Sequence, residues 1–378
     1  MKKHTPVVIL STADFDSRIW TNKQHIAVRL SKICDVYYIE SLGLRTPKVN
    51  FEDVRRVAGR FFAAIPGHRT QSSNKDKIHN LVVISPFVLP WHNSTTIRSI
   101  NRLLIRILMK RKLPDRYILW TFSPLTYDLE QSAVSVIYHS VDLLHKLPGI
   151  PKTVLLNQER RLISRADAVI ASSKGVKDHI KTQGGEALLW ENVADIELFS
   201  SHQSYERERR AIFVGNLTQS KVDFAILENL IRLNVRIALA GPCSIDGTQR
   251  DPLLNRILQS KNVTYLGVLT QKEMAVELGR SWVGIIPYHI NDYTNGVFPM
   301  KIYEYLASGL PVIATKLRSL NSLAIDGLDL VSSDEFASRV LHLCESERRA
   351  PAGIYDNNSW EARLAQIQDL LRRIGGAG

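Results

Sequence analysis

The stretch GVFPMKIYEYLASGLPVIAT, residues 296–315, predicts a short helix followed at once by a buried strand. Pro299 suits the first position of a helix, because its fixed φ is already helical and its missing N–H would have no helical partner there. Gly309 and Pro311 end the helix, and the apolar residues 311–315 fit a strand covered on both faces. Such a helix–strand step is typical of an α/β fold with a parallel sheet.

The same alternation extends outward through most of the chain. A first series of strand-like segments comprises VVILS (7–11), VYYIES (36–41), LVVIS (81–85), YILWTF (117–122), VSVIYHS (134–140) and AVIASS (168–173). A second series comprises AIFVGN (211–216), RIALAG (236–241), VTYLG (263–267), VGIIPY (283–288), LPVIAT (310–315) and LDLVSS (328–333). Amphipathic segments such as 20–33 and 154–165 lie between strands. The pattern predicts two doubly wound, Rossmann-like parallel-sheet domains.

A chain of 378 residues is long enough for two domains. The polar stretch FSSHQSYERERR (199–210) between the two series has the composition of a linker. We therefore expect a first domain over 1–200 and a second over 205–355. Residues 356–378 are expected to form a C-terminal helix that starts at a Ser359 cap and can cross back to the first domain.

Charge and cysteine content narrow the class of protein. The chain has 49 basic and 37 acidic residues, a formal net charge of +12 that favours anionic partners. Nucleic-acid binding is a rival interpretation, but no aromatic-interleaved basic motif, zinc spacing or recognition helix supports it, so we expect no nucleic acid. Cys34, Cys243 and Cys344 match no disulfide or metal spacing, and no apolar run has signal-peptide or membrane-spanning length. These features indicate a cytoplasmic protein.

The helix at 299 offers a site for a phosphorylated ligand. Met300 and Lys301 supply its first free N–H groups, and the Lys301 ammonium adds a full positive charge. Glu304, one turn later, is poorly placed for phosphate but well placed to accept hydrogen bonds from a vicinal diol. Phosphate at the helix tip and ribose one turn down describe a nucleotide diphosphate. The alternative is an ordinary surface Lys–Glu pair at i, i+3.

Four segments carry a resemblance to a known family. FPMKIYEYLASGLPVIAT (298–315) resembles the donor-binding helix of the GT-B glycosyltransferases, and FVGNL (213–217) resembles the glycine loop that opens their second domain. SRADAVIASS (164–173) with ENVADIELF (191–199) resembles the passage between their two domains. The chain is most similar to the bacterial surface-polysaccharide branch that includes the xanthan glucuronosyltransferase. The resemblance implies a GT-B fold, with two Rossmann-like domains facing across a cleft.

The resemblance also implies a set of donor-binding residues. Lys301 would bind the diphosphate, and Glu304 the ribose or its neighbouring phosphate. The other implied donor contacts are Met300, Tyr288, and the glycine-loop residues Gly215 and Asn216 with Lys221 nearby. For Tyr288 the alternative is an ordinary tyrosine at a strand end. Gly296 stands where the retaining relatives carry a second glutamate, and Asn216 where they carry an arginine, so the sequence favours inversion.

Asp142 is the candidate catalytic base for an inverting transfer. It follows the strand SVIYHS (135–140), where a parallel sheet directs side chains toward its ligand, and it resembles the base of the xanthan-type enzyme. The alternative is a helix N-cap. His139 and His145 are further candidate bases.

The loop ADFDSR (13–18) is expected to serve the acceptor. Asp14, Arg18 and Trp20 would line its entrance, with His25 nearby. The Asp-x-Asp pattern holds a metal in a different transferase fold, whereas GT-B enzymes use a helix end and basic side chains. We therefore expect no metal and no cofactor.

A basic amphipathic helix is expected over TIRSINRLLIRILMKRKLPDR (96–116). Arg98, Arg102, Arg106 and Lys110 recur every four residues, and Ile97, Ile100, Leu104 and Ile107 form another face. Such a helix is typical of peripheral binding to an anionic membrane, the inner face of the cytoplasmic membrane here. The segment 54–70 repeats the mixture of Arg and Phe. The alternative is a helix that packs on the sheet with a solvated basic face.

Taken with the resemblance, these features imply a glycosyltransferase of bacterial surface-polysaccharide synthesis. Its donor would be a nucleotide-diphosphate sugar, a UDP-sugar by resemblance, and its acceptor a polyprenyl-diphosphate-linked saccharide or a polysaccharide. A retaining GT-B transferase is one alternative. A sugar-nucleotide epimerase or hydrolase of the same fold is another, which would need a second acid or base beside the donor.

Overall fold

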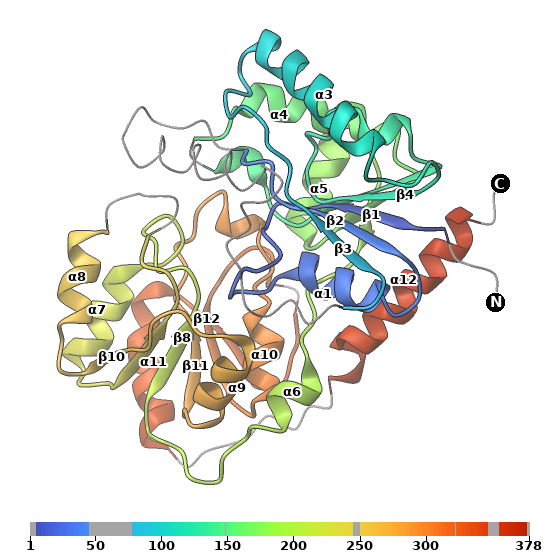
Figure 1. Ribbon diagram of the computed structural model, residues 1–378. Helices are drawn as coiled ribbons and strands as arrows, with labels where there is room; N and C mark the ends of the chain where they lie inside the picture. Colours follow the sequence, from blue (N-terminus) through green and yellow to red (C-terminus); the bar gives the residue numbers. More distant parts are fainter. Residues whose placement is uncertain are drawn as a thin grey trace, which may run out of the picture. The chain divides into compact units, whose positions relative to one another are not determined.

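The computed structural model describes residues 5–44, 78–147, 149–244, 250–321, 323–346 and 355–375. The chain divides into two compact units, which are described separately below (Figure 1). The first unit comprises Met1–Glu191 together with Leu364–Gly378, and the second comprises Asn192–Arg363. The segment 54–70, expected to contribute to a membrane-binding surface, lies outside the described residues.

The first unit is built on a seven-stranded sheet in the order β3-β2-β1-β4-β5-β6-β7, in which every neighbouring pair is parallel. Its strands are β1 (Val7–Leu10), β2 (Val36–Ile39), β3 (Leu81–Ile84), β4 (Ile118–Thr121), β5 (Ser135–Ser140), β6 (Ala168–Ala171) and β7 (Leu188–Leu189). β1, β4 and β5 are wholly buried, as continuous apolar strands covered on both faces should be.

The second unit contains a six-stranded parallel sheet in the order β10-β9-β8-β11-β12-β13. Its strands are β8 (Ala211–Val214), β9 (Ile237–Ala240), β10 (Val263–Tyr265), β11 (Val283–Ile286), β12 (Val312–Thr315) and β13 (Leu328–Val331). The four central strands β9, β8, β11 and β12 are fully buried in one apolar core.

Helices connect the strands in both units (Figure 1). Those of the first unit are α1 (Asn22–Leu30), α3 (Thr95–Lys110), α4 (Lys152–Ile163) and α5 (Lys174–Thr182), with short 3₁₀ turns η1 (Leu129–Gln131) and η2 (Leu144–Lys146). Those of the second are α6 (Ile196–Ser200), α7 (Phe224–Arg232), α8 (Pro252–Leu258), α9 (Gln271–Gly279), α10 (Lys301–Ala307) and α11 (Ser333–Glu345), with η3 (Thr294–Gly296) and η4 (Asp356–Asn358). The last helix is α12 (Trp360–Gly375).

The prediction of two doubly wound α/β sheets is confirmed, and each of the twelve expected strands is present. The sequence missed β7, since a pair of leucines shows no periodicity. The Ser359 cap is confirmed as well, because the Ser359 hydroxyl accepts a hydrogen bond from the Ala362 N–H at 3.1 Å.

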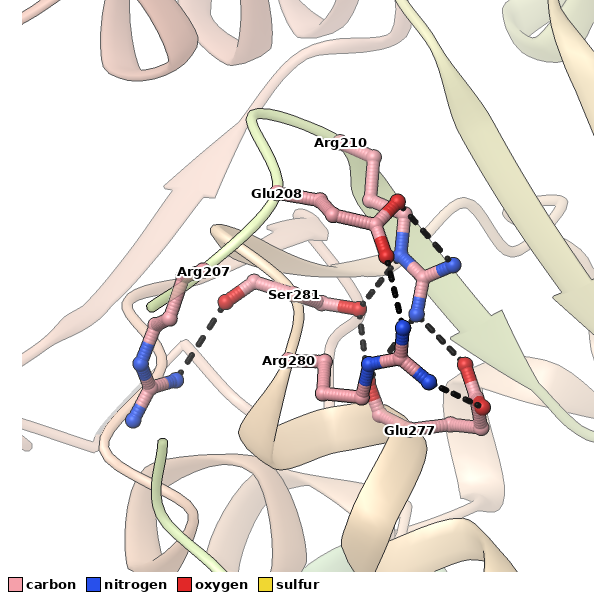
Figure 2. Close-up of polar contacts among 6 residues, drawn as sticks. All are labelled: Arg207, Glu208, Arg210, Glu277, Arg280 and Ser281. Carbon is pink, nitrogen blue, oxygen red and sulfur yellow. Dashed lines mark hydrogen bonds and ion pairs between the residues drawn. The ribbon is translucent and has the colours of Figure 1, made fainter. Parts of the chain in front are cut away.

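The charged stretch expected to be a linker is held against the second sheet instead. Arg210, 7% exposed, directly precedes β8; its guanidinium pairs with Glu277 at 2.5 Å and donates to the Ser281 hydroxyl at 3.1 Å. Glu208 bridges Arg210 and Arg280, as Figure 2 shows. Composition alone cannot distinguish such a network from a solvated linker, because its partners come from the end of α9 and the residues after it, some 70 residues further on. This network lies at the amino ends of β8 and β11, away from the strand ends where ligands bind in such sheets.

Candidate functional site

The second sheet reverses its strand order between β8 and β11, and its carboxyl edge at that point is the expected position for a ligand. Gly215 and Asn216 follow β8 directly, and Tyr288 follows β11. β12 lies next to β11, and α10 leads into it, so Lys301 comes from the adjoining crossover. The donor residues predicted from the sequence therefore converge on one edge of one sheet.

Lys301 lies over the glycine loop. A Cβ atom built on Gly215 would lie 2.7 Å from the Lys301 Cε and 3.1 Å from its Nζ, so glycine leaves room for the ammonium. The Nζ also lies 6.0 Å from the centre of the Phe213 ring, within the range of a cation–π contact. In the described part of the chain no carboxylate pairs with this ammonium, and it remains available to an anionic ligand.

Glu304 is buried beside this lysine. It is 6% exposed, and within the described residues its carboxylate makes no hydrogen bond or ion pair. Burial raises the pKa of the Glu304 carboxyl to about 7, and the nearby Lys301 ammonium opposes that rise. The alternative of a surface Lys–Glu pair is wrong, because the glutamate is in the interior. A buried carboxylate without a partner is costly unless a ligand supplies donors, as the hydroxyls of a ribose would.

α10 is held rigidly where it carries these two residues. The Tyr305 hydroxyl accepts a hydrogen bond from the Val214 N–H at 2.8 Å, which fixes α10 to the end of β8. Gly284 in β11 makes room for the Tyr305 ring, since a Cβ there would lie 2.3 Å from a ring carbon. At the far end the Leu310 N–H bonds to the Tyr305 carbonyl and Gly309 has φ of +71°, which is a Schellman termination.

Pro299 is not the first residue of α10, as the sequence predicted. The helix begins at Lys301, and Met300 is its N-cap without a side-chain hydrogen bond. The Pro299 carbonyl accepts from the Ile302 N–H at 3.3 Å, so the proline belongs to the turn that enters the helix. The fixed φ of proline suits that turn as well as the first helical turn, so the sequence alone could not distinguish a helix start at Pro299 from one at Lys301.

Tyr288 and Lys221 also lie at the carboxyl edge of the second sheet. Tyr288 is 1% exposed and packs edge-on against Phe213, with ring centroids 6.1 Å apart. The Lys221 Nζ lies 5.3 Å from the Tyr288 ring centre and 5.9 Å from that of Tyr293. The burial of Tyr288 fits the alternative of a structural tyrosine at a strand end, and its contact with a donor stays a prediction. Asn216 is half-buried next to Gly215.

In the first unit, Asp142 lies two residues beyond β5 and is half-buried. It caps no helix: the N-cap of the following turn η2 is Leu143, so that alternative is wrong. Within the described residues the Asp142 carboxylate makes no hydrogen bond or ion pair. Its strand is second from β1 in the sheet, close to the reversal of strand order between β1 and β4.

The two histidines considered as further bases have other surroundings. His139 is 2% exposed and its Nδ1 accepts from the Trp120 indole at 3.4 Å, which is a core position. His145 stacks on His179 with ring centroids 4.4 Å apart. Burial, and next the neighbouring His179, lower the pKa of His145 to about 4.

The expected acceptor residues come from one loop between β1 and α1. Asp14 and Arg18 are exposed, whereas Trp20 is half-buried and packs edge-on against His25 at 5.3 Å. The Asp14 carbonyl accepts a hydrogen bond from the Gln24 amide at 3.0 Å, which shapes the loop. Their role toward an acceptor stays a prediction.

α3 exposes a stripe of apolar side chains. Ile100, Leu103, Leu104 and Ile107 are 42%, 57%, 39% and 52% exposed, while Asn101, Ile105 and Met109 face the core. The helix therefore packs against the core, as the alternative expected, but through a face other than the isoleucine face, and membrane binding stays a prediction. Two of the four basic residues bind other parts of the protein. Arg98 donates to the His92 and Asn93 carbonyls, and Arg102 pairs with Asp128 at 2.6 Å. The other two, Arg106 and Lys110, are exposed.

Sequence reasoning missed the residues that position the site rather than form it. Phe213 and Tyr293 flank the two lysines, and Tyr305 anchors α10. Their aromatic character resembles that of any core position, so spacing gives no signal. The cluster of His145, Glu159 and His179 in the first unit was missed because its members come from three elements that are separate in the sequence.

Comparison with known proteins bears on this site. Residues 208–346, which carry the glycine loop and α10, match the model of a family described as "Glycosyl transferases group 1". Residues 208–346 of the chain are therefore similar to the group 1 glycosyl transferases. All seven predicted donor residues fall inside the matched residues.

One curated relative matches a longer part of the chain than the family does. A Bacillus subtilis (strain 168) protein named as a teichuronic acid biosynthesis glycosyltransferase, TuaH, is 28% identical over 219 residues, 54% of this chain. The match spans 53% of that relative, so the chain covers about half the length of the curated relative it matches.

Solved structures show the same fold. Sucrose-phosphate synthase of Thermosynechococcus elongatus aligns with a TM-score of 0.72 at 16% identity, covering 99% of this chain and 100% of that one. Anabaena HepE, in complex with UDP and glucose, aligns with a TM-score of 0.57 at 12% identity, covering 99% of each chain. The α/β fold is that of the GT-B glycosyltransferases, as the resemblance implied.

Proposed function

We propose that the chain is a glycosyltransferase that takes a sugar from a nucleotide-diphosphate sugar, a UDP-sugar, and passes it to a surface-polysaccharide acceptor. One observation carries the proposal: the Lys301 ammonium lies over Gly215, beside the buried Glu304, and neither has an ion-pair partner within the described ranges. Both lie at the carboxyl edge of the sheet within the residues that match the group 1 family. An ammonium over a glycine loop suits a diphosphate, and a neighbouring carboxylate suits ribose hydroxyls. The teichuronic acid relative and the UDP complex of Anabaena HepE support this assignment.

For the reaction itself, we propose Asp142 as the general base. An acceptor hydroxyl must lose a proton as it attacks the anomeric carbon, and a half-buried carboxylate at a strand end is suited to accept it. Lys301 would stabilise the charge on the departing diphosphate, so no metal is needed for donor binding. Attack from the side opposite the diphosphate inverts the anomeric configuration.

For the acceptor, we propose a saccharide carried on a polyprenyl diphosphate at an anionic membrane surface. The exposed stripe of Ile100, Leu103, Leu104 and Ile107, flanked by Arg106 and Lys110, supports this. Monomeric proteins seldom leave four apolar side chains of one helix face exposed without an interaction. Among the described residues no helix has the length and hydropathy needed to cross a membrane.

The donor site is tested by calorimetry with UDP and GDP on the Lys301→Ala variant. A charge-assisted contact worth about 1.5–3 kcal/mol is lost, so UDP should bind about 10–150-fold more weakly. Lys261→Ala is the matched control, since Lys261 is exposed at the amino end of β10. Wild-type UDP affinity in Lys301→Ala would refute the proposed phosphate contact. UDP binding should persist in EDTA.

A further inference from the structure

Two imidazoles and a carboxylate converge in the first unit, apart from the residues assigned above to donor and base. His145 lies in η2, Glu159 in α4 and His179 in α5. One ligand atom from each lies within 4.8 Å of those of the other two. Three separate elements of the chain therefore bring metal-binding side chains to one place.

Glu159 is fixed in a manner that suits a ligand. It is 5% exposed; one carboxylate oxygen accepts from the Tyr138 hydroxyl at 2.6 Å and the other from the His179 Nε2 at 2.7 Å. Tyr138 belongs to β5, which anchors the carboxylate to the sheet. A hydrogen bond to the far oxygen of a ligating carboxylate is the usual support behind a metal centre.

An internal Glu–His pair explains two of the three side chains but not His145. The His145 ring lies at 28° to the His179 ring and stacks on it, and in the described part of the chain it makes no hydrogen bond to protein. The ring nitrogens of this half-buried imidazole, beside a second imidazole and a carboxylate, are therefore available to water or to an ion.

We propose that His145, Glu159 and His179 bind one divalent transition-metal ion of the Zn²⁺ type, with water as a fourth ligand. Two imidazoles and one carboxylate are a donor set for Zn²⁺ and its neighbours, whereas Mg²⁺ and Ca²⁺ prefer oxygen alone. The site is independent of the proposed transfer function, and it requires no metal at the donor.

The distances allow the ion to enter with small side-chain movements. Tetrahedral bonds of about 2.0–2.2 Å place neighbouring ligand atoms about 3.3 Å apart. The Glu159–His179 contact, now 2.7 Å, must open slightly, and the widest separation, at most 4.8 Å, must close. The His179 Nε2–H proton leaves for solvent or moves to Nδ1 as the ion takes its place. Both movements are within the reach of χ rotations.

The bound ion would join η2 to α4 and α5. Because η2 begins two residues after Asp142, the ion would hold the segment that follows the proposed base. Any ion that binds the folded chain more tightly than the unfolded one also raises stability.

The test uses the untagged full chain, freed of metal with a chelator and then desalted. Zn²⁺ is titrated by calorimetry, and Co²⁺ by visible absorption, which distinguishes tetrahedral from octahedral sites. We expect one equivalent of Zn²⁺ and a tetrahedral Co²⁺ spectrum. His145→Gln should weaken the affinity by about 10²-fold, because even an outer partner of a ligand is worth 10–100-fold. His145 is half-buried outside the core strands, so the variant should fold, which circular dichroism checks.

Two further variants make the outcome decisive. His342→Gln removes an exposed imidazole from α11 in the second unit and should leave the binding curve unchanged. His145→Cys retains a ligand and should add a thiolate-to-cobalt charge-transfer band. Equal Zn²⁺ affinity in wild type and His145→Gln, an octahedral Co²⁺ spectrum, or no new band in His145→Cys would each overturn the proposal.

Discussion

At the scale of single residues, Glu304 shows what a buried carboxyl at the proposed donor site costs the protein in stability. Its carboxyl is buried and has no hydrogen-bond or ion-pair partner among the residues that the structure describes, and burial raises its pKa to about 7. Near neutral pH the site therefore holds a carboxyl that readily exchanges its proton. Hydroxyl donors from a ribose would favour the charged form, so nucleotide binding and ionisation of Glu304 should be linked.

The cost can be measured as a pH-dependent change in stability. The folded-state pKa of about 7 exceeds the ordinary glutamate pKa of 4.5, so the folded protein binds this proton more tightly than the unfolded chain. Stability is therefore highest below pH 4.5 as far as Glu304 is concerned, and the penalty grows until about pH 7. Glu304→Gln should raise the free energy of unfolding by up to about 3 kcal/mol at pH 8 and by little at pH 4.

Urea unfolding of Glu304→Gln and wild type at both pH values measures this difference. Glu206→Gln is the control, because Glu206 is exposed in the same unit. A stability difference that is the same at pH 4 and pH 8 would show that Glu304 does not titrate as its burial implies.

At the scale of elements, α3 shows that the sequence can predict the spacing of basic residues along an amphipathic helix but not which face is buried. The four-residue spacing of the basic side chains was recognised, but the buried face was not, because Asn101 occupies its centre. The Asn101 amide accepts from the Leu89 N–H and donates to the Leu89 carbonyl, both at 2.8 Å. A polar side chain that hydrogen-bonds to the backbone of a loop can lie on the buried face of a helix, whereas hydropathy alone predicts that it lies on the solvent-exposed face.

Membrane binding by α3 is expected to depend on the basic residues that remain exposed. The triple variant Arg106→Gln, Lys110→Gln, Arg111→Gln removes three charges worth about 1 kcal/mol each near an anionic surface. Co-sedimentation with vesicles rich in phosphatidylglycerol should therefore weaken by about 10²-fold.

The control for this variant changes the net charge equally. Lys152, Lys174 and Lys177 are exposed on α4 and α5 of the same unit, and their replacement by glutamine should leave vesicle binding nearly unchanged. If both triple variants lose binding alike, overall charge rather than α3 accounts for the attraction. Vesicles of neutral lipid should bind none of the three proteins well.

At the scale of the whole molecule, the fold followed from continuous apolar strands, and the site followed only in part. Lys301 and Glu304 were found from spacing within one helix. Their contact with Gly215 and the burial of Glu304 were not, because both depend on strand order in the sheet. Local patterns fix elements, whereas the partners of a site residue come from segments far away in the sequence.

The division of the chain allows binding and chemistry to be tested apart. The proposed donor residues belong to the second unit, and Asp142 belongs to the first. A substitution at Asp142 should therefore leave UDP affinity close to that of wild type, whereas Lys301→Ala should not. UDP affinity therefore tests the donor site without depending on Asp142, and the two assignments can fail independently of each other.

Asp142→Asn is the variant on which the inverting mechanism depends. Asparagine keeps the shape of the side chain but cannot accept the proton of an acceptor hydroxyl, so sugar transfer should fall about 10²–10⁴-fold, the usual contribution of a general base. The control is Asp115→Asn, since Asp115 is exposed between α3 and β4. With wild type, proton NMR of the product should show the anomeric configuration opposite to that of the donor. A retained configuration, or near-normal turnover in Asp142→Asn, would refute Asp142 as the base of an inverting transfer. The proposal of a glycosyltransferase would then rest on Lys301, Glu304 and the similarity to known glycosyltransferases.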